Sequence, residues 1–408
     1  MHDEQSGKPA LFGVRVLEIG SFVAAPMAAR ILGDFGASVI KVELPATGDE
    51  LRQWGTMLPT RDGPISAWWL SMARNKRLIT LDLRQRAGQA LALRLVECSD
   101  IVIENFRPGR LEAWGLGEEA LRAANPRLVL VRISGFGQTG PYRERAGYGN
   151  VAESMGGLRY VTGFADRPPV RVGVSLGDAL AAQQAAFGAL LALRVAEQTG
   201  QGQTVDVAIA ESVFAMTEAM VTEYTRAGVV RERSGNTMLR AAPSNVYRTR
   251  DDHWLALGAN GENVFRRLCD ALGQPEMAAD ARFRDNRARI AHHEELDAII
   301  GGWVAARPLA EIQSALDAAG VPAGPVLSIA DIAADAHFQA RGMIANVPDE
   351  RLPDGAAIMP GIVPRLSVTP GAIGRTGAAL GADNRAIYGD LLGLSDAEIA
   401  TLTAQQII

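Results

Sequence analysis

The chain has 408 residues, of which 48% are hydrophobic and 21% charged, and its formal net charge is −5. This composition is that of an ordinary globular protein with room for two domains, and the negative charge argues against a nucleic-acid partner. Two cysteines, Cys98 and Cys269, are far apart in sequence, so we expect no disulfide framework and a cytoplasmic location. The first ten residues show no apolar signal segment, and no apolar run predicts a membrane span.

Strands and helices alternate through the first third of the chain. Short apolar runs are separated by amphipathic stretches of helical length, a rhythm that indicates parallel strands joined by right-handed crossovers. We therefore predict an α/β fold whose large, Rossmann-like domain is built on a parallel sheet. The predicted strands are 14–19, 38–43, 78–83, 101–105, 128–134 and the later run TVDVAI, and the predicted helices are 26–35, 87–97 and 211–224.

The rhythm changes after a charged, glycine-bearing loop at 226–243. There, strands are followed by several helices, which indicates a smaller α+β domain. We interpret VPAGPVLSIADIAAD as a linker that returns the chain to the large domain. The helices of the smaller domain are predicted at 261–272, 287–305 and 309–319.

The predicted large domain thus draws on both ends of the chain. Its first part is 1–225, the inserted small domain is 226–330, and 331–408 forms the linker and the return to the large domain. Ser395 and Glu398 have the spacing of a capping box and predict a final helix.

One carboxylate, Asp178, stands at the start of a long uncharged run. Gly177 precedes it, and residues 179–193 are Ala, Gln, Leu, Phe and Gly without any charge. This pattern predicts a buried helix, and an acid at its mouth is held by backbone N–H groups and the helix dipole. Two interpretations stay open at this point: a structural N-cap aspartate, or an oriented nucleophile.

Two other motifs are weak signals. The run GFGQTG at 135–140 matches a dinucleotide fingerprint, but Pro141 follows where a helix should open on the phosphates. We interpret it as a mobile glycine-rich loop that approaches a bound acyl group closely. The pair His292 and His293 is adjacent on a predicted helix, where the two rings point about 100° apart, so a solvated face is favoured over a metal site.

Basic and aromatic clusters leave alternatives open. The runs 74–77 and 107–110 are arginine-rich and adjoin predicted strands, and they are either solvated surface charge or contacts for a phosphorylated ligand. Trp54, Trp68 and Trp69 lie in an irregular stretch and either pack internally or line a small-molecule pocket.

Several blocks occur in a fixed order along nearly the whole chain: GVRVLEIGSFVAAPMAARILGDFGASVIKVE, NKRLITLDL, IVIENFRPG, ISGFGQTGPYRERAGYGNVAESMGGLRYVTG, VGVSLGDALAA, TGQGQTVDVAIAESV and LGLSDAEIATL. Together they resemble the family III CoA-transferases, the group of formyl-CoA and carnitine CoA-transferases and their racemase relatives. The resemblance implies an interlocked homodimer and acyl-CoA and carboxylic acid substrates, with no permanently bound cofactor and no metal.

The resemblance also implies roles for individual residues. Asp178 matches the nucleophile, which forms an acyl anhydride and then an aspartyl-CoA thioester, with oxyanions stabilised by N–H groups of the helix start and of the loop at Gly137. Tyr148 matches an active-site tyrosine. The implied CoA contacts are Phe22, Val23, Ala24, Leu81, Arg84, Asn105, Phe106 and Arg107, and the implied acyl-pocket residues are Trp54 and Trp68.

Departures from the family pattern narrow the range of reactions that we expect. Racemase relatives carry a His-Asp pair where this chain has Tyr148 and Gly149, so one of the two acid/base groups needed for racemisation is missing. The acid that usually follows the tyrosine in transferases is also absent. We therefore expect a CoA-transferase that uses succinyl-CoA and a dicarboxylate acceptor, with an α-methylacyl-CoA racemase as the alternative. Arg240 or Arg171 is the expected partner of a distal carboxylate.

Overall fold

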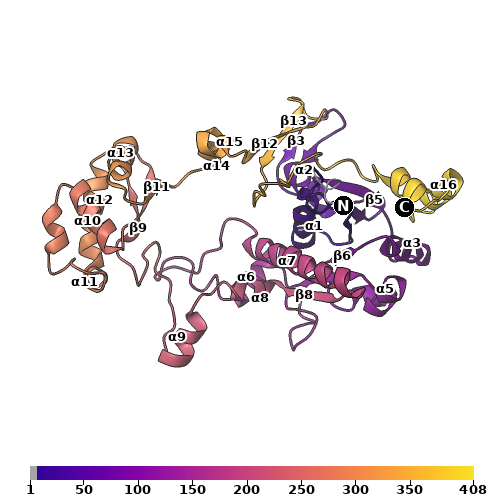
Figure 1. Cartoon of the computed structure of the whole chain (residues 1–408), viewed down its shortest axis with the longest axis horizontal. Coiled ribbons are helices and arrows are strands. Elements are labelled where there is room, and N and C mark those ends of the chain that lie inside the picture. The colour runs from indigo at the N-terminus through magenta and orange to yellow at the C-terminus, as the bar shows by residue number, and fades with distance from the viewer. Residues whose placement is uncertain (1–6) are drawn as a thin grey trace. The chain divides into compact units, whose positions relative to one another are not determined.

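The computed structural model describes residues 7–408 and contains two compact units, the first of which is built on a six-stranded parallel sheet (Figure 1). The strand order β5-β2-β1-β6-β7-β8 reverses direction between β1 and β6, as in doubly wound folds, so a crevice is expected there at the carboxyl ends of the strands. The predicted α/β fold with a parallel sheet is confirmed. The strands are β1 (Arg15–Glu18), β2 (Ser38–Glu43), β5 (Lys76–Thr80), β6 (Ile101–Glu104), β7 (Val129–Ser134) and β8 (Thr204–Ala208).

Helices cover both faces of this sheet because its strands are apolar on both sides. On one face α1 (Ala24–Asp34) and α7 (Leu176–Thr199) pack on side chains such as Val16 and Val131. On the other face lie α3 (Arg86–Glu97), α5 (Glu118–Ala124) and the segment that ends in α16 (Asp396–Ala404). The Ser395–Glu398 capping box of α16 is present as predicted.

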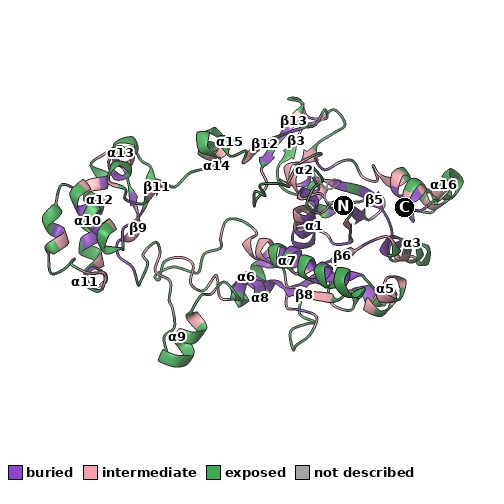
Figure 2. Cartoon of the chain, viewed as in Figure 1, coloured by how far each residue is buried: buried purple, intermediate pink, exposed green. Residues whose placement is uncertain are grey.

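The long helix α7 approaches the sheet closely because its inner side is made of small residues. Nine of its 24 residues are buried, and seven of these nine are alanines. At Gly188 even a Cβ would lie 2.6 Å from Val205 Cγ1. Contrary to the expectation from sequence, α7 is long and apolar enough to cross a membrane, but a buried core helix passes the same test. Figure 2 shows its buried side turned to the sheet and its exposed side turned away.

Several predicted boundaries were wrong. The helix predicted at 211–224 is broken into α8 (Ile209–Phe214) and α9 (Met220–Ala227). The sequence patterns did not predict several short elements, which include the 3-10 turn η1 and the π-helical turn η3. These short elements are η1 (Glu50–Gln53), β3 (Met57–Leu58), β4 (Ile65–Ser66), α2 (Ala67–Met72), α4 (Arg110–Ala113), α6 (Gly149–Met155), α14 (Ile329–Ala334), α15 (Ala336–Ala340), β12 (Ile344–Pro348), β13 (Ala356–Pro360) and η3 (Arg385–Leu391).

A second compact unit holds a small antiparallel sheet, β11-β10-β9, with helices packed on it. The predicted return linker contains β11, which pairs with β10, so part of that linker belongs to this sheet. The predicted helix 287–305 is split at His292. The elements are β9 (Ser244–Arg248), β10 (Trp254–Gly258), α10 (Glu262–Ala271), η2 (Pro275–Ala279), α11 (Asn286–Ala291), α12 (His293–Ala305), α13 (Leu309–Ala319) and β11 (Ala323–Pro325).

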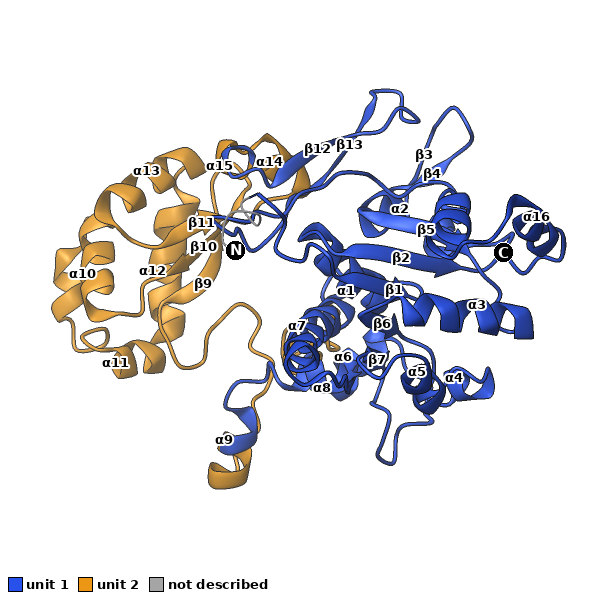
Figure 3. Ribbon diagram, turned by 45° about the vertical axis from the view of Figure 1, so that its right-hand side comes forward, with its two compact units in different colours: residues 1–158, 172–222, 339–408 blue, residues 159–171, 223–338 orange. Residues whose placement is uncertain are grey.

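The two units divide the chain as coloured in Figure 3. The first contains the chain up to Leu158, Val172–Thr222 and Gln339–Ile408, and the second contains Arg159–Arg171 and Glu223–Phe338. The segment Arg159–Arg171, assigned to the large domain on sequence grounds, therefore clusters with the second unit.

Candidate active site

The candidate residues of the first unit follow the carboxyl ends of its strands. Phe22 comes after β1, Arg84 after β5, Asn105 after β6 and the glycine loop after β7. In open α/β sheets this edge, next to the point where the strand order reverses, is where ligands bind. The fold thus brings to one edge several segments that are far apart in sequence.

The Phe22 turn, residues 20–23, leads from β1 into α1. Asn105 holds it on both sides, because its Oδ1 accepts from Ser21 N at 2.9 Å and its Nδ2 donates to Ser21 O at 2.8 Å. Phe22 has φ +64°, an uncommon left-handed conformation for a bulky residue. Gly20 is required beside it, since a Cβ there would lie 2.5 Å from Asn105 Oδ1. Both polar atoms of the Asn105 amide therefore form hydrogen bonds that hold this turn.

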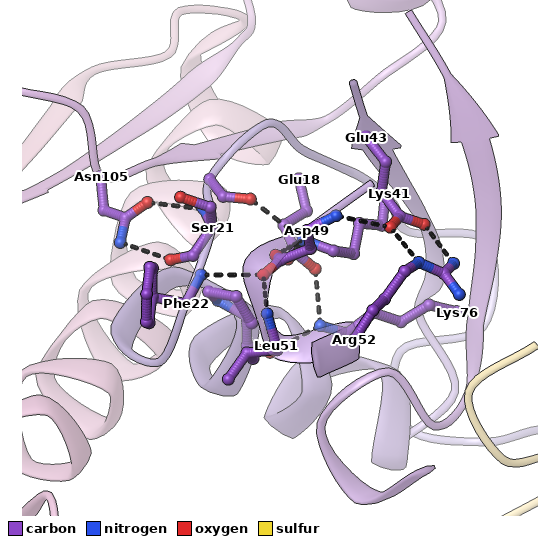
Figure 4. Close-up of polar contacts among 12 residues, drawn as sticks. Glu18, Ser21, Phe22, Lys41, Glu43, Asp49, Leu51, Arg52, Lys76 and Asn105 are labelled. Carbon is purple, nitrogen blue, oxygen red and sulfur yellow. Dashed lines mark hydrogen bonds and ion pairs between the residues drawn. The ribbon is translucent and has the colours of Figure 1, made fainter. Parts of the chain in front are cut away.

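A buried charge cluster lies against the same turn (Figure 4). It consists of three cations and three carboxylates, Glu18, Lys41, Glu43, Asp49, Arg52 and Lys76, whose formal charges cancel. Lys41 Nζ lies 2.9 Å from Glu18 Oε1, 2.7 Å from Asp49 Oδ2 and 3.0 Å from Gly20 O. Lys76 Nζ lies 2.6 Å from Glu18 Oε2. Ionic contacts thus tie the Phe22 turn to β2 and β5.

The two lysines of the charge cluster respond differently to burial. Burial lowers the pKa of Lys76 to about 8, against the attraction of Glu18. Burial would lower the pKa of Lys41 as well, but the carboxylates of Asp49 and Glu18 outweigh it and raise that pKa above its ordinary value. Lys41 is the better stabilised cation because it has two carboxylate partners, whereas Lys76 shares only one of them.

Asp49 connects the charge cluster to an aromatic group. Its Oδ1 accepts from Leu51 N at 2.9 Å, capping η1, and from Phe22 N at 3.4 Å. Trp54 follows η1, and its ring centroid lies 5.3 Å from that of Phe22 and 5.3 Å from that of Trp68. The predicted pocket residues Trp54 and Trp68 therefore lie together with Phe22, while Trp69 is buried in the core beside them.

Asp178 lies in the first turn of α7 and is not its N-cap, which corrects the structural interpretation made from sequence. The helix begins at Leu176 with Ser175 as N-cap, and the Ser175 side chain makes no capping hydrogen bond. The Asp178 carboxylate lies against Gly149, where a Cβ would sit 2.8 Å from Asp178 Cγ and closer still to Oδ2. In this conformation the Asp178 carboxylate occupies the space that a side chain at 149 would need.

Helix α6 begins at Gly149 and carries two further groups of interest. Tyr148, immediately before it, is 75% exposed, so its phenol is open to a ligand. Glu153, one turn further on, is 2% exposed, and its Oε1 accepts from Gly177 N at 2.9 Å. Neither the contact of Gly149 nor the role of Glu153 was visible in the sequence, because both depend on where α6 packs.

The glycine loop after β7 is held by two hydrogen bonds of its own. Gly137 N donates to Ser134 Oγ at 2.9 Å, and Gln138 N donates to Asp206 Oδ2 at 2.9 Å. Gly137 has φ +88°, which favours glycine. In this conformation these two N–H groups are already occupied, so an oxyanion role for them requires the loop to rearrange.

The two arginine-rich runs differ in how far their cationic side chains are buried. In the run 74–77, Arg74 forms a bidentate pair with Asp34 and Lys76 belongs to the charge cluster, both buried, so neither of the two interpretations made from sequence describes them. In contrast, Arg107 and Arg110 are exposed and line a surface hollow of about 340 Å³ together with Arg143 and Glu144. Three guanidinium groups around one hollow suit a phosphate ligand.

Several implied CoA contacts cannot be made by side chains in this conformation. Val23, Ala24 and Leu81 are buried in the core, so only their backbones can reach a ligand. Phe106 packs edge-on against Trp114 at 5.1 Å. Arg84 is mostly exposed and forms an ion pair with Asp82 at 2.7 Å, and Arg84 holds the pKa of Asp82 down at about 2.

The candidates for acceptor binding belong to the second unit. Arg240 is 66% exposed at its side chain, and its Nη1 lies 3.1 Å from Glu223 Oε1. Arg171 is exposed. Within residues 7–408, the structure contains no group of three or more His, Cys, Asp or Glu side chains that could hold a metal ion.

Comparisons with known proteins agree with this description of the fold. The model of CoA-transferase family III matches residues 11–384, so the chain belongs to that family and is a CoA-transferase. It is 50% identical over 408 residues to a succinyl-CoA–D-citramalate CoA-transferase of Chloroflexus aurantiacus, covering 100% of both chains. It is 42% identical over 399 residues to the alpha subunit of a succinyl-CoA–L-malate CoA-transferase of Chloroflexus aurantiacus, covering 98% of this chain and 92% of the relative.

The fold has a solved counterpart. A CaiB/BaiF family protein of Brucella suis superposes with a TM-score of 0.84 at 33% identity, covering 94% of this chain and 100% of that one. The resemblance noted in the sequence blocks is thereby confirmed, as is the expected class of enzyme.

Proposed function

We propose that the protein transfers CoA from succinyl-CoA to a small dicarboxylate of the malate or citramalate type, with Asp178 as the nucleophile. The observation that carries the nucleophile assignment is the Asp178 carboxylate in the first turn of α7, seated against the backbone of Gly149. The names of the two Chloroflexus relatives, both succinyl-CoA transferases with C4 or C5 hydroxydicarboxylate partners, support the choice of substrates.

The first half-reaction forms and consumes an anhydride. A carboxylate oxygen of Asp178 attacks the thioester carbonyl of succinyl-CoA, the C–S bond breaks, and CoA leaves as a thiolate. The thiolate then attacks the aspartyl carbonyl, the anhydride C–O bond breaks, and succinate leaves as a carboxylate. Asp178 is left as a CoA thioester. No net proton is gained or lost.

The second half-reaction repeats these steps in reverse. The acceptor carboxylate attacks the aspartyl thioester, CoA thiolate leaves, and a new anhydride joins the acceptor to Asp178. The thiolate attacks the acceptor's acyl carbonyl, which yields the new acyl-CoA and frees the Asp178 carboxylate. A carboxylate nucleophile suits this chemistry because it is chemically interchangeable with both substrate acids.

Two features support CoA binding at the carboxyl edge of the sheet. The Phe22 turn presents the backbone of residues 22–24 at the start of α1, and the hollow lined by Arg107, Arg110 and Arg143 offers guanidinium groups to phosphates. Trp54 and Trp68 form the acyl pocket in this proposal. Leu81, Arg84, Asn105 and Phe106 complete the CoA site, the last two by shaping it. Tyr148, whose chain neighbour Gly149 contacts Asp178, assists with its exposed hydroxyl.

The distal carboxylate of the acceptor needs a cationic partner, and Arg240 is the proposed one. Its pairing with Glu223 at 3.1 Å leaves the side chain largely exposed, so it can bind a second carboxylate. Arg171 is the other candidate of the second unit. The racemase alternative has no structural feature in its favour, because Tyr148 and Gly149 supply no histidine base.

A homodimer in the cytoplasm, with subunits interlocked through the segments between domains, is part of the proposal. The support is exposed apolar surface within the described residues: Phe187 and Leu191 on α7 are 59% and 55% exposed, and α9 buries none of its residues although it contains Met220, Val221 and Tyr224. Such surface usually lies at an interface. The domain division proposed from the sequence, a large domain from 1–225 and 331–408 with a small domain inserted at 226–330, is kept except that Arg159–Arg171 and the chain up to Phe338 are added to the small domain.

The test combines a substrate panel with the variant Asp178→Asn. We expect the wild type to transfer CoA from succinyl-CoA to dicarboxylates in preference to monocarboxylates, and the variant to lose about 10⁴-fold or more in kcat while it stays folded. Intact-protein mass spectrometry during turnover should detect CoA bound to Asp178, and hydroxylamine should trap the acyl-aspartyl species.

Asp390→Asn, at an exposed ion pair with Arg385, is the matched control and should keep full activity. Wild-type turnover by Asp178→Asn would refute the nucleophile assignment. Exchange of the α-hydrogen of an acyl-CoA in deuterium oxide without CoA transfer would instead support the racemase alternative.

A further inference from the structure

Helix α6 contacts the start of α7 at two points. Gly149 touches the Asp178 carboxylate, and Glu153 accepts a hydrogen bond from the backbone N–H of Gly177, the residue before the nucleophile. Residues four apart lie on the same face of a helix, so a single face of α6 makes both contacts. One of these contacts limits where the nucleophile's side chain can lie, and the other fixes its backbone.

The Glu153 contact replaces a missing cap. The first N–H groups of any helix have no partner within the helix, and a side chain at the N-cap usually satisfies one of them. Ser175 occupies the N-cap of α7 without making that bond. Glu153, which is 2% exposed, supplies the acceptor from another helix at 2.9 Å from Gly177 N.

Packing leaves this arrangement little freedom. A Cβ on Gly177 would lie 3.0 Å from Glu153 Cγ and 3.2 Å from Ile209 Cγ2, so Gly177 is held between α6 and α8. The hydrogen bond acts on a backbone that is already confined on both sides. The hydrogen bond and the packing together therefore fix the first turn of α7, and Asp178 with it.

We propose that Glu153 is a positioning residue for Asp178: it holds the first turn of α7 so that the nucleophile's carboxylate keeps one orientation through the anhydride and thioester steps. This inference rests on the proposed function. Its physical basis is that covalent catalysis depends steeply on the placement of the attacking atom. Glu153 itself needs no contact with substrate.

Three substitutions separate the hydrogen bond from the charge. Glu153→Gln keeps an acceptor oxygen at the same reach, Glu153→Asp keeps the charge but shortens the side chain by one methylene, and Glu153→Ala removes both. We expect kcat to fall about 10²-fold in Glu153→Ala and by a comparable factor in Glu153→Asp, with most of it recovered in Glu153→Gln. The rate of aspartyl-CoA formation from succinyl-CoA in a single turnover should follow the same order.

The controls separate positioning from general destabilisation. The dissociation constant of CoA, measured by calorimetry, should stay at the wild-type value in all three variants. Asp285→Ala removes the side-chain cap of α11 in the second unit, where Asp285 Oδ1 accepts from Ala288 N at 2.8 Å, and it should lower the melting temperature without changing kcat. If Glu153→Ala does not fold, the kcat values of Glu153→Asp and Glu153→Gln are compared instead, and they test the positioning role on their own.

Wild-type kcat in Glu153→Ala and Glu153→Asp would overturn the inference, as would equal losses in Gln and Asp variants. Asp178→Asn, measured in parallel, keeps this outcome distinct from a failure of the proposed function. Loss of turnover in Asp178→Asn with no effect at Glu153 would refute only the positioning role.

Discussion

The Phe22 turn and the Asp178 corner, which consists of Gly149, Glu153, Gly177 and Asp178, are held in place by opposite means. The Phe22 turn rests on the charge cluster, in which six ionisable side chains pair with one another, five of them buried and Arg52 partly exposed. The Asp178 corner relies instead on glycines at 149 and 177, whose missing side chains let α6 and α7 come into contact. The first region binds a turn through charge, and the second positions a carboxylate through close packing.

This difference predicts different failures. Removing one charge from the cluster leaves a partner buried and unpaired, which costs stability. Adding one atom in the Asp178 corner leaves the fold's charges intact but displaces the nucleophile, which costs turnover. Substitutions in the charge cluster should therefore lower the free energy of unfolding, and substitutions in the Asp178 corner should lower kcat.

The largest effect is expected for Lys41→Met. Lys41 is buried and contacts Glu18, Asp49 and Gly20 O, so its loss should lower the free energy of unfolding by about 3–5 kcal/mol. Urea unfolding at neutral pH measures this. Lys8→Met, the same change at an exposed lysine, is the matched control and should shift stability by less than about 0.5 kcal/mol. Equal stabilities of the two variants would contradict the structural role of the cluster.

Gly149→Ala should act on turnover instead. A Cβ at 149 cannot coexist with the present position of Asp178, so we expect kcat to fall about 10²-fold while CoA still binds. Gly302→Ala on α12, where nothing lies within 4 Å of an added Cβ, is the control and should retain activity. Steady-state kinetics with succinyl-CoA measures both. An active Gly149→Ala enzyme would mean that the contact does not constrain the nucleophile.

Lys76 provides the smallest and most specific test of the charge cluster. Its pKa is lowered by burial to about 8, below the value of 10.5 for a free lysine, so from pH 8 upward the unfolded chain binds more protons than the folded one. The contribution of Lys76 to the free energy of unfolding must therefore rise with pH, by about 1 kcal/mol between pH 7 and pH 9. Below pH 8 both states are protonated and the contribution is flat.

The chain has only three lysines, so NMR of ¹³C-labelled lysine side chains can follow Lys76 directly. The resonance that disappears in Lys76→Met should titrate with a midpoint at about 8. A midpoint at the ordinary value for lysine would show that burial is fully compensated by Glu18. The pH-dependent gain in stability should also be absent from Lys76→Met.

Periodicity predicted the parallel sheet because each of its strands is a short run rich in Val, Leu and Ile, and five of the six lie at or within two residues of the predicted bounds. Here β5 begins at Lys76, ahead of the predicted strand, because buried ion pairs let a charged residue enter the sheet. The same pairs explain why neither surface charge nor ligand binding describes Arg74 and Lys76 of the run 74–77, whereas Arg77 is exposed. A sequence pattern does not reveal which charges find partners.

The candidate site was predictable where it depends on sequence blocks and not where it depends on packing. Asp178 is proposed as the nucleophile because of the uncharged helix that follows it and the family resemblance. The contact of Gly149 with Asp178 and the hydrogen bond from Gly177 to Glu153 depend on the approach of α6 to α7, which no local signal encodes. The break between α8 and α9 was missed because the residues on both sides of it favour helix.

The buried position of Lys41 and Lys76 has a practical consequence for labelling. Of the three lysines only Lys8 is exposed, so an amine-reactive dye or cross-linker meets a single lysine side chain in the folded protein. That lysine precedes every residue assigned to the site, the first of which is Phe22. The native enzyme therefore carries a ready single-lysine attachment point for immobilisation, and appearance of a second modified lysine would report opening of the sheet.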